Sequence, residues 1–79
     1  MVVKPKQPSW EERAKRFLKA ELKRADMTYE ELAAKLEKHG LEESKSSVAS
    51  KMSRGTFAAT FFLASLAALG VENIRLEDI

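Results

Sequence analysis

Apolar residues recur every three or four positions along most of this chain, which is the period of a helix with one buried face. The first run follows Ser9-Trp-Glu-Glu12, a capping-box pattern, and predicts a helix from Trp10 to Ala25. One apolar stripe of this helix is expected to pack in the core, and Trp10 is assigned to it rather than to base stacking. The stripe consists of Trp10, Ala14, Phe17, Leu18, Leu22 and Ala25.

Two further helices follow, each with its own start and stop signals. A second capping box, Thr28-Tyr-Glu-Glu31, opens a helix that should end at His39-Gly40. Ser44 can cap a third helix, which Gly55 ends in the same way. The buried positions predicted for these two helices are Leu32, Ala33, Leu36, Val48, Ala49 and Met52.

The fourth predicted helix, Phe57–Leu69, has almost no charged face and is closed by Gly70. A helix that is apolar on all sides is either central or shared with a second copy of the chain. We expect core packing first and a subunit interface second, and residues 71–79 should include a short extended segment at Ile74–Leu76, with a terminal helical turn as the alternative. The candidate interface residues are Phe57, Phe61, Phe62, Ile74 and Leu76.

These elements predict an all-α domain of four helices spanning residues 9–79, preceded by a flexible basic arm at residues 1–8 with two prolines and two lysines. The chain has no cysteine, which fits a reducing cytoplasm, and no apolar run of the roughly 20 residues that a membrane span requires. We therefore expect a cytoplasmic protein without a membrane partner.

The net charge is only +2, but the charges are unevenly distributed. Residues 1–24 hold eight basic and three acidic residues, whereas residues 25–43 hold six acidic and two basic residues. Such asymmetry affects how a protein meets charged partners and is compatible with a basic side that binds an anion.

The third helix carries the main candidate site. Between Ser44 and Thr56 there are three cations and no carboxylate, and the face opposite the core is rich in serine. Hydroxyls and cations suit phosphate oxygens and base edges, although the same residues could form an ordinary solvated face. The expected groove contacts are Ser46, Ser47, Ser50, Lys51 and Arg54, and the expected phosphate contacts are Lys45, Tyr29, Arg13, Arg16 and Lys19. The basic residues of the first helix could equally be solvated.

Catalysis is hard to assemble from this sequence. The single histidine, His39, lies at a helix end, and there is neither a second histidine nor a cysteine to complete a metal site. No base stands out that could activate a serine, and no glycine-rich phosphate loop is present. We expect no enzyme activity, cofactor, metal or small-molecule substrate.

Three segments carry a resemblance to known families. Thr28-Tyr-Glu-Glu-Leu-Ala33, Met52-Ser-Arg-Gly55 and Leu66-Ala-Ala-Leu-Gly-Val71 resemble the phage-repressor (Cro/C1-type) helix-turn-helix family. That resemblance implies a compact all-α domain whose third helix enters the DNA major groove. The span from Trp10 to Leu76 is more closely similar to a family of small bacterial proteins described only as a domain of unknown function.

The sequence departs from the repressor pattern at three points. Tyr29 replaces a phosphate-binding glutamine, Ser53 replaces a glutamate before Arg-Gly, and the link at Glu37–Glu43 is about six residues longer than a tight helix-turn-helix allows. Acidic residues in this link could tilt the third helix or repel DNA.

We expect a small transcriptional regulator that binds double-stranded DNA through the major groove, as a homodimer. The alternative is a protein-interaction or self-assembly module on the same scaffold without DNA binding, which the acidic link favours. A structural or antitoxin-like partner protein is a third possibility.

Overall fold

The computed structural model describes residues 8–79 and contains four α-helices and one short 3-10 helix in that range. The helices are α1 (Trp10–Arg24), α2 (Tyr29–Lys38), α3 (Lys45–Arg54) and α4 (Ala59–Ala68), followed by η1 (Leu76–Asp78). The all-α class predicted from the sequence is confirmed. The predicted arm at residues 1–8 lies, apart from Pro8, outside the described residues.

Local signals fix the ends of the first three helices as predicted. The Ser9 hydroxyl accepts a hydrogen bond from the Glu12 backbone N–H at 3.2 Å, and Thr28 and Glu31 form a complete capping box. Gly55, with a φ of 74°, ends α3 in the left-handed conformation. The capping box at Ser9 is incomplete. Among the described residues, the Glu12 carboxylate forms ion pairs with Lys15 and Arg16 and no hydrogen bond with the Ser9 backbone N–H.

The start of α4 differs from the prediction. The helix begins at Ala59 rather than Phe57, and its N-cap residue, Ala58, has no side chain that could accept a hydrogen bond. Because Ala58 offers no polar side chain, no local signal fixes where α4 begins, and Thr56 and Phe57 belong to the link that follows α3. The helix ends close to the predicted site, where the Val71 backbone N–H bonds the Leu66 carbonyl at 2.9 Å.

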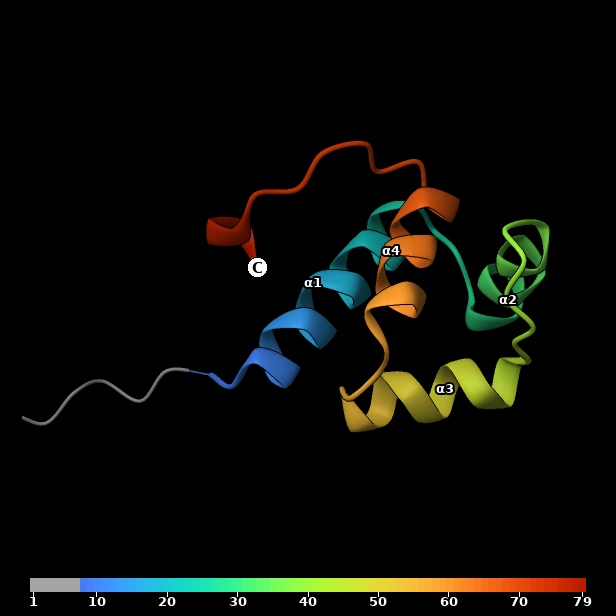
Figure 1. Cartoon of the computed structure of the whole chain (residues 1–79), viewed down its shortest axis with the longest axis horizontal. Helices are drawn as coiled ribbons and strands as arrows, with labels where there is room; N and C mark the ends of the chain where they lie inside the picture. Colours follow the sequence, from blue (N-terminus) through green and yellow to red (C-terminus); the bar gives the residue numbers. More distant parts are fainter. Residues whose placement is uncertain (1–7) are drawn as a thin grey trace, which may run out of the picture.

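The core lies where all four helices meet. Figure 1 shows α3 along one edge of the molecule, α2 at one end, and α4 crossing α1. The tail after α4 runs along the side of α1 opposite α3. The buried apolar residues are Leu18, Leu22, Leu32, Ala33, Leu36, Val48, Met52, Phe61 and Leu66.

Three residues of the predicted first stripe, Trp10, Ala14 and Ala25, lie outside this core and outside the residues packed against it. Trp10 is 60% exposed, and Ala25 is exposed at the C-terminal end of α1. Trp10 lines a shallow hollow together with Gly55, Thr56 and Phe57, so the link from α3 to α4 passes beside the indole and leaves most of it uncovered. The helical period identified the correct face of α1 but not how far the other helices extend along it.

The C-terminal tail combines the two predicted alternatives. Residues 71–75 have no regular secondary structure, Arg75 has an extended backbone, and the chain then forms the single turn η1. The expected extended segment therefore ends before Leu76, which belongs to the turn. A hydrogen bond of 2.9 Å from the Arg13 Nε to the Ile79 backbone oxygen fastens this turn to α1.

Candidate nucleic-acid interface

The outward face of α3 carries hydroxyls and one arginine. Val48 and Met52 are fully buried, and the residues on the opposite side of the helix are exposed. Those exposed residues are Ser46, Ser50, Ser53 and Arg54. Three of them were predicted to contact DNA. Ser53 was not, although it follows Ser46 by seven residues and Ser50 by three, which places all three serines on one face of the helix. No carboxylate belongs to this face.

Ser47 has a structural role at the start of α3. Its hydroxyl accepts a hydrogen bond from the Ser44 backbone N–H at 2.8 Å, while the Ser44 hydroxyl accepts from the Ser47 N–H at 3.1 Å. The same Ser47 hydroxyl donates to Glu43 Oε1 at 2.6 Å. The Ser47 hydroxyl hydrogen and one of its lone pairs are therefore used within the chain, and its contact with DNA stays a prediction.

Lys51 is also engaged within the chain rather than free. Its Nζ lies 2.8 Å and 2.7 Å from the two carboxylate oxygens of Glu43 and 5.3 Å from the centre of the Phe61 ring. The side chains of Lys51 and Glu43 are only 26% and 10% exposed. Burial alone would raise the pKa of the Glu43 carboxyl, but the hydrogen bonds from Lys51 and Ser47 outweigh it and lower that pKa.

Acidic residues gather at the N-terminal end of α3. Glu37, Glu42 and Glu43 line a surface hollow there together with Ser44 and Ser47. Glu43 is neutralised by Lys51, whereas Glu42 and Glu37 are exposed. The negative charge at this end would repel phosphate, so the part of α3 best suited to an anion is its middle and C-terminal half.

Two cations of α3 remain available. Lys45, in the first turn, and Arg54, in the last, are both exposed, and neither belongs to an ion pair among residues 8–79. Arg54 follows Ser50 by one helical turn, which aligns a guanidinium with two hydroxyls along one face.

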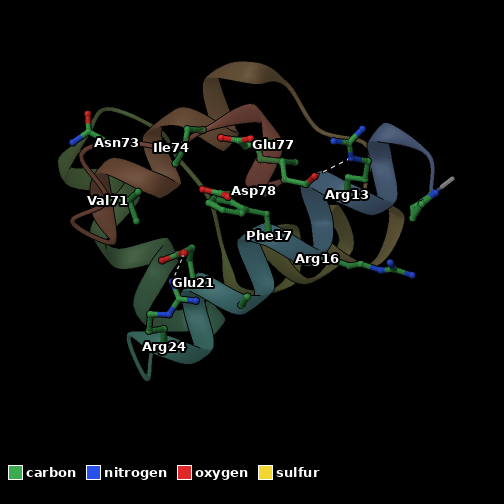
Figure 2. Close-up of a pocket in the computed structure, with 13 residues that line it drawn as sticks. Arg13, Arg16, Phe17, Glu21, Arg24, Val71, Asn73, Ile74, Glu77 and Asp78 are labelled. Atoms are coloured by element: carbon green, nitrogen blue, oxygen red, sulfur yellow. Dashed lines mark hydrogen bonds and ion pairs between the residues drawn. The ribbon is translucent and has the colours of Figure 1, made fainter.

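The predicted phosphate contacts on α1 lie in a different environment. Arg13 and Arg16 line a groove between α1 and the tail, together with Phe17 and Ile74 (Figure 2). The Arg13 guanidinium bonds the tail and lies over the Trp10 ring, and Arg16 pairs with Glu12 at 3.5 Å. This groove faces the tail, on the side of α1 opposite α3 in Figure 1. Lys19, by contrast, is exposed and in no ion pair of the described residues.

Tyr29 opens α2 and is half-buried, with its ring packed against the core cluster. Its hydroxyl takes part in no hydrogen bond among the described residues. A phenol at the first position of a helix, with its ring held by packing, can still donate to a phosphate oxygen.

The predicted interface residues separate into two groups. Phe61 is only 2% exposed, Phe57 packs on both Phe61 and Phe62, and Phe62 packs on Phe17. These three rings therefore belong to, or pack against, the core of a single chain. Leu76 is 71% exposed and Ile74 is half-buried. Leu63 of α4 was not predicted as an interface residue, yet it is 60% exposed. Because nearly every residue of this helix is apolar, the sequence pattern did not show which side faces solvent.

Two further features are absent from the described residues. No group of three or more histidine, aspartate or glutamate side chains there could hold a metal ion. No helix within residues 8–79 is both long and apolar enough to cross a membrane.

Comparison with known proteins gives one match. Residues 10–74 match the model of a family described as Domain of unknown function (DUF6471). No curated protein and no solved structure matches the chain.

Proposed function

The chain belongs to the DUF6471 family, and from that premise we propose that it is a small DNA-binding module of the helix-turn-helix type. The proposal keeps the resemblance of Thr28–Ala33, Met52–Gly55 and Leu66–Val71 to Cro/C1-type repressors. In that arrangement α3 enters the major groove of double-stranded DNA, and two copies of the chain bind half-sites about 34 Å apart.

The observation that carries this proposal is the outward face of α3. Ser46, Ser50, Ser53 and Arg54 are exposed together, without a carboxylate among them and without an internal partner for the Arg54 guanidinium in the described ion pairs. Small hydroxyl side chains let a helix backbone come close to base edges, and arginine can bind guanine or phosphate through two nitrogens. The α3 face is thus chemically suited to a groove.

The internal pairing of Lys51 changes which residues are proposed to bind. Arg54, Ser50, Ser46 and Ser53 would contact the groove, while Lys45, Lys19 and Tyr29 would hold phosphates. Arg13 and Arg16 contribute long-range positive charge but are not proposed as contacts, because their groove faces the tail. The exposed acids Glu37 and Glu42 near the start of α3 would weaken phosphate binding at that end, so the strongest contacts are proposed for its C-terminal half.

We further propose that the chain is a cytoplasmic transcriptional regulator that acts as a homodimer, because its sequence lacks cysteine and resembles Cro/C1-type repressors. A dimer doubles the number of phosphate contacts, which a domain of this size needs for useful affinity at physiological salt.

A titration of the protein with a labelled random-sequence duplex at low and at moderate salt tests the proposal. Phosphate neutralisation makes the logarithm of affinity fall linearly with the logarithm of salt concentration. We expect saturable binding at low salt that weakens steeply as salt rises. No binding at low salt would refute the proposal.

A second candidate function is self-assembly or protein interaction without DNA. The observation in its favour is Leu63, 60% exposed on a helix that has no charged residue between Ala59 and Ala68. If α4 is the interface, a Leu63→Lys variant would abolish concentration-dependent association, measured by sedimentation. Because the DNA-binding proposal also includes a homodimer, the duplex titration distinguishes the two functions: association of the wild-type protein without DNA binding at low salt would favour self-assembly alone.

A further inference from the structure

Trp10 is the one tryptophan of the chain, and its position is unusual for so large an apolar side chain. Its ring is 60% exposed at the first residue of α1. Full burial of an aromatic ring of this size would stabilise the fold by about 2 to 3 kcal/mol, so an exposed one contributes little to the core. An exposed tryptophan in a surface hollow is better suited to a partner than to stability.

The Trp10 ring is held in place from one side. The Arg13 guanidinium carbon lies 4.0 Å above the ring centre, and the Arg13 Nε is bonded to the Ile79 backbone oxygen at 2.9 Å. A cation fixed by a second contact restricts the ring that it covers. The ring is therefore partly preorganised while its indole N–H makes no hydrogen bond within the described chain.

The first turn of α1 also lies directly against the end of α3. A Cβ placed on Gly55 would come within 3.1 Å of the Glu11 backbone oxygen, so the two backbones are in close contact at that point. Arg54, the residue before Gly55, belongs to the proposed DNA-contacting face. Figure 1 shows the N-terminal turn of α1 beside the C-terminal end of α3. Trp10 and Arg54 thus lie on adjoining turns of two different helices.

Charge around this corner favours an anionic partner. The cations at this corner are Arg13 over the ring, Lys15 at Gly55 and Arg54 directly before Gly55, and the carboxylates are Glu12 and Glu11, the latter lining the same hollow as Trp10. Glu12 is already paired with both Lys15, at 3.1 Å, and Arg16, at 3.5 Å, which leaves Glu11 as the single unpaired acid among them. The surroundings of Trp10 therefore carry a net positive charge.

We propose that Trp10 is a second DNA contact of this domain, whose indole N–H donates to a phosphate oxygen of the backbone strand that flanks the groove occupied by α3. This inference rests on the proposed DNA-binding function and assigns to it a residue on α1. Hydrogen bonds from side-chain donors to phosphates fix the orientation of a protein on the duplex. The Trp10 contact would in this way fix how far the C-terminal half of α3 enters the groove.

Because the chain has one tryptophan, its fluorescence reports on Trp10 alone. The wild-type protein is titrated with an unlabelled random-sequence duplex, and binding of a labelled copy of the same duplex is followed separately by anisotropy. We expect Trp10 emission to change saturably, with the same midpoint as the anisotropy. We also expect Trp10→Ala to weaken binding about tenfold, as loss of a hydrogen bond to a charged group does. Trp10→Phe, which keeps a ring but has no N–H, should weaken it nearly as much.

A matched control is Asn73→Ala, which removes another exposed side-chain N–H donor, on the tail that runs along the side of α1 opposite α3, and should leave DNA affinity unchanged. Circular dichroism of each variant checks that it is folded. If Trp10→Ala does not fold, the emission of the wild-type protein alone tests whether Trp10 contacts DNA.

Anisotropy that shows binding with unchanged Trp10 emission would overturn the Trp10 proposal and leave DNA binding intact. Anisotropy that shows no binding would overturn both. Emission that changes with protein concentration in the absence of DNA would instead place Trp10 in a contact between two copies, against the proposal.

Discussion

The carboxylate of Glu43 binds the ammonium group of Lys51 through both of its oxygens, at 2.8 Å and 2.7 Å. The pair joins the link that follows α2 to the third turn of α3, eight residues further along the chain. Ser47 donates to the same carboxylate. One glutamate thus holds the entrance of α3 and removes a cation from the surface that the sequence assigned to DNA.

This pairing predicts that Lys51 contributes nothing to the salt dependence of DNA binding. Lys51→Met should leave the slope of log affinity against log salt unchanged, whereas Arg54→Gln should reduce its magnitude by about one, because one phosphate fewer is neutralised. Duplex titrations of both variants over a salt series measure the two slopes. Circular dichroism is needed beside them, because Lys51→Met leaves Glu43, whose side chain is only 10% exposed, without its partner. An equal reduction of slope in both variants would mean that Lys51 leaves Glu43 to bind DNA.

The lowered pKa of Glu43 makes part of the stability pH-dependent. A carboxyl whose pKa is lower in the folded than in the unfolded chain stabilises the fold above its ordinary value of 4.5, and this contribution is lost as pH falls through the folded pKa. Glu43→Gln should therefore cost about 1 to 2 kcal/mol at neutral pH, and the difference from wild type should shrink as the pH falls below 4.5 and through the lowered pKa of folded Glu43. Urea unfolding of both proteins over a pH series gives this difference. The pKa values of Glu12 and Glu31 are lowered too, by hydrogen bonds from Lys15 and from Thr28. Both carboxyls are present in wild type and variant alike, so their contributions cancel in the difference in unfolding free energy.

Much of this fold was predictable because its signals are local. Ser9, Thr28 and Ser44 cap the three helices that the sequence assigned to them, and Gly55 ends α3. A cap involves residues within one turn of each other, so it can be recognised without knowledge of the tertiary structure. Where α4 lacks such a signal, the predicted start was two residues too early.

The candidate site was predicted less completely because its key interactions are not local. Helical projection correctly separated Val48 and Met52 from Ser46, Ser50 and Arg54. It could not show that Lys51 reaches back across the link to Glu43, nor that Arg13 binds a backbone oxygen 66 residues away. Both interactions depend on the path of the chain between helices, which periodicity does not contain.

A buried hydroxyl on α4 provides a test of core energetics. Ser65 is fully buried, and its Oγ has no hydrogen-bond partner among the described residues. An unsatisfied buried hydroxyl costs about 1 to 3 kcal/mol, and alanine keeps the helix without it. We therefore expect Ser65→Ala to stabilise the protein by about 1 kcal/mol, after allowance for the small void it leaves. Thermal and urea unfolding measure the change. Destabilisation by a similar amount would show that the hydroxyl finds a partner in solution.

Gly55 and Gly70 offer a matched pair of substitutions that tests how α1 and α3 meet. Both have a left-handed backbone, with φ values of 74° and 79°, where any side chain adds strain of about 1 to 2 kcal/mol. Only at Gly55 is the space filled, since a Cβ there would lie 3.1 Å from the Glu11 backbone oxygen and 3.5 Å from the Lys15 Cδ, whereas nothing lies within 4 Å at Gly70. Gly55→Ala should thus cost about 2 to 3 kcal/mol and Gly70→Ala about 1, measured by urea unfolding. Equal costs would mean that α3 does not approach α1 closely, and the corner that brings Trp10 beside Arg54 would lose its support.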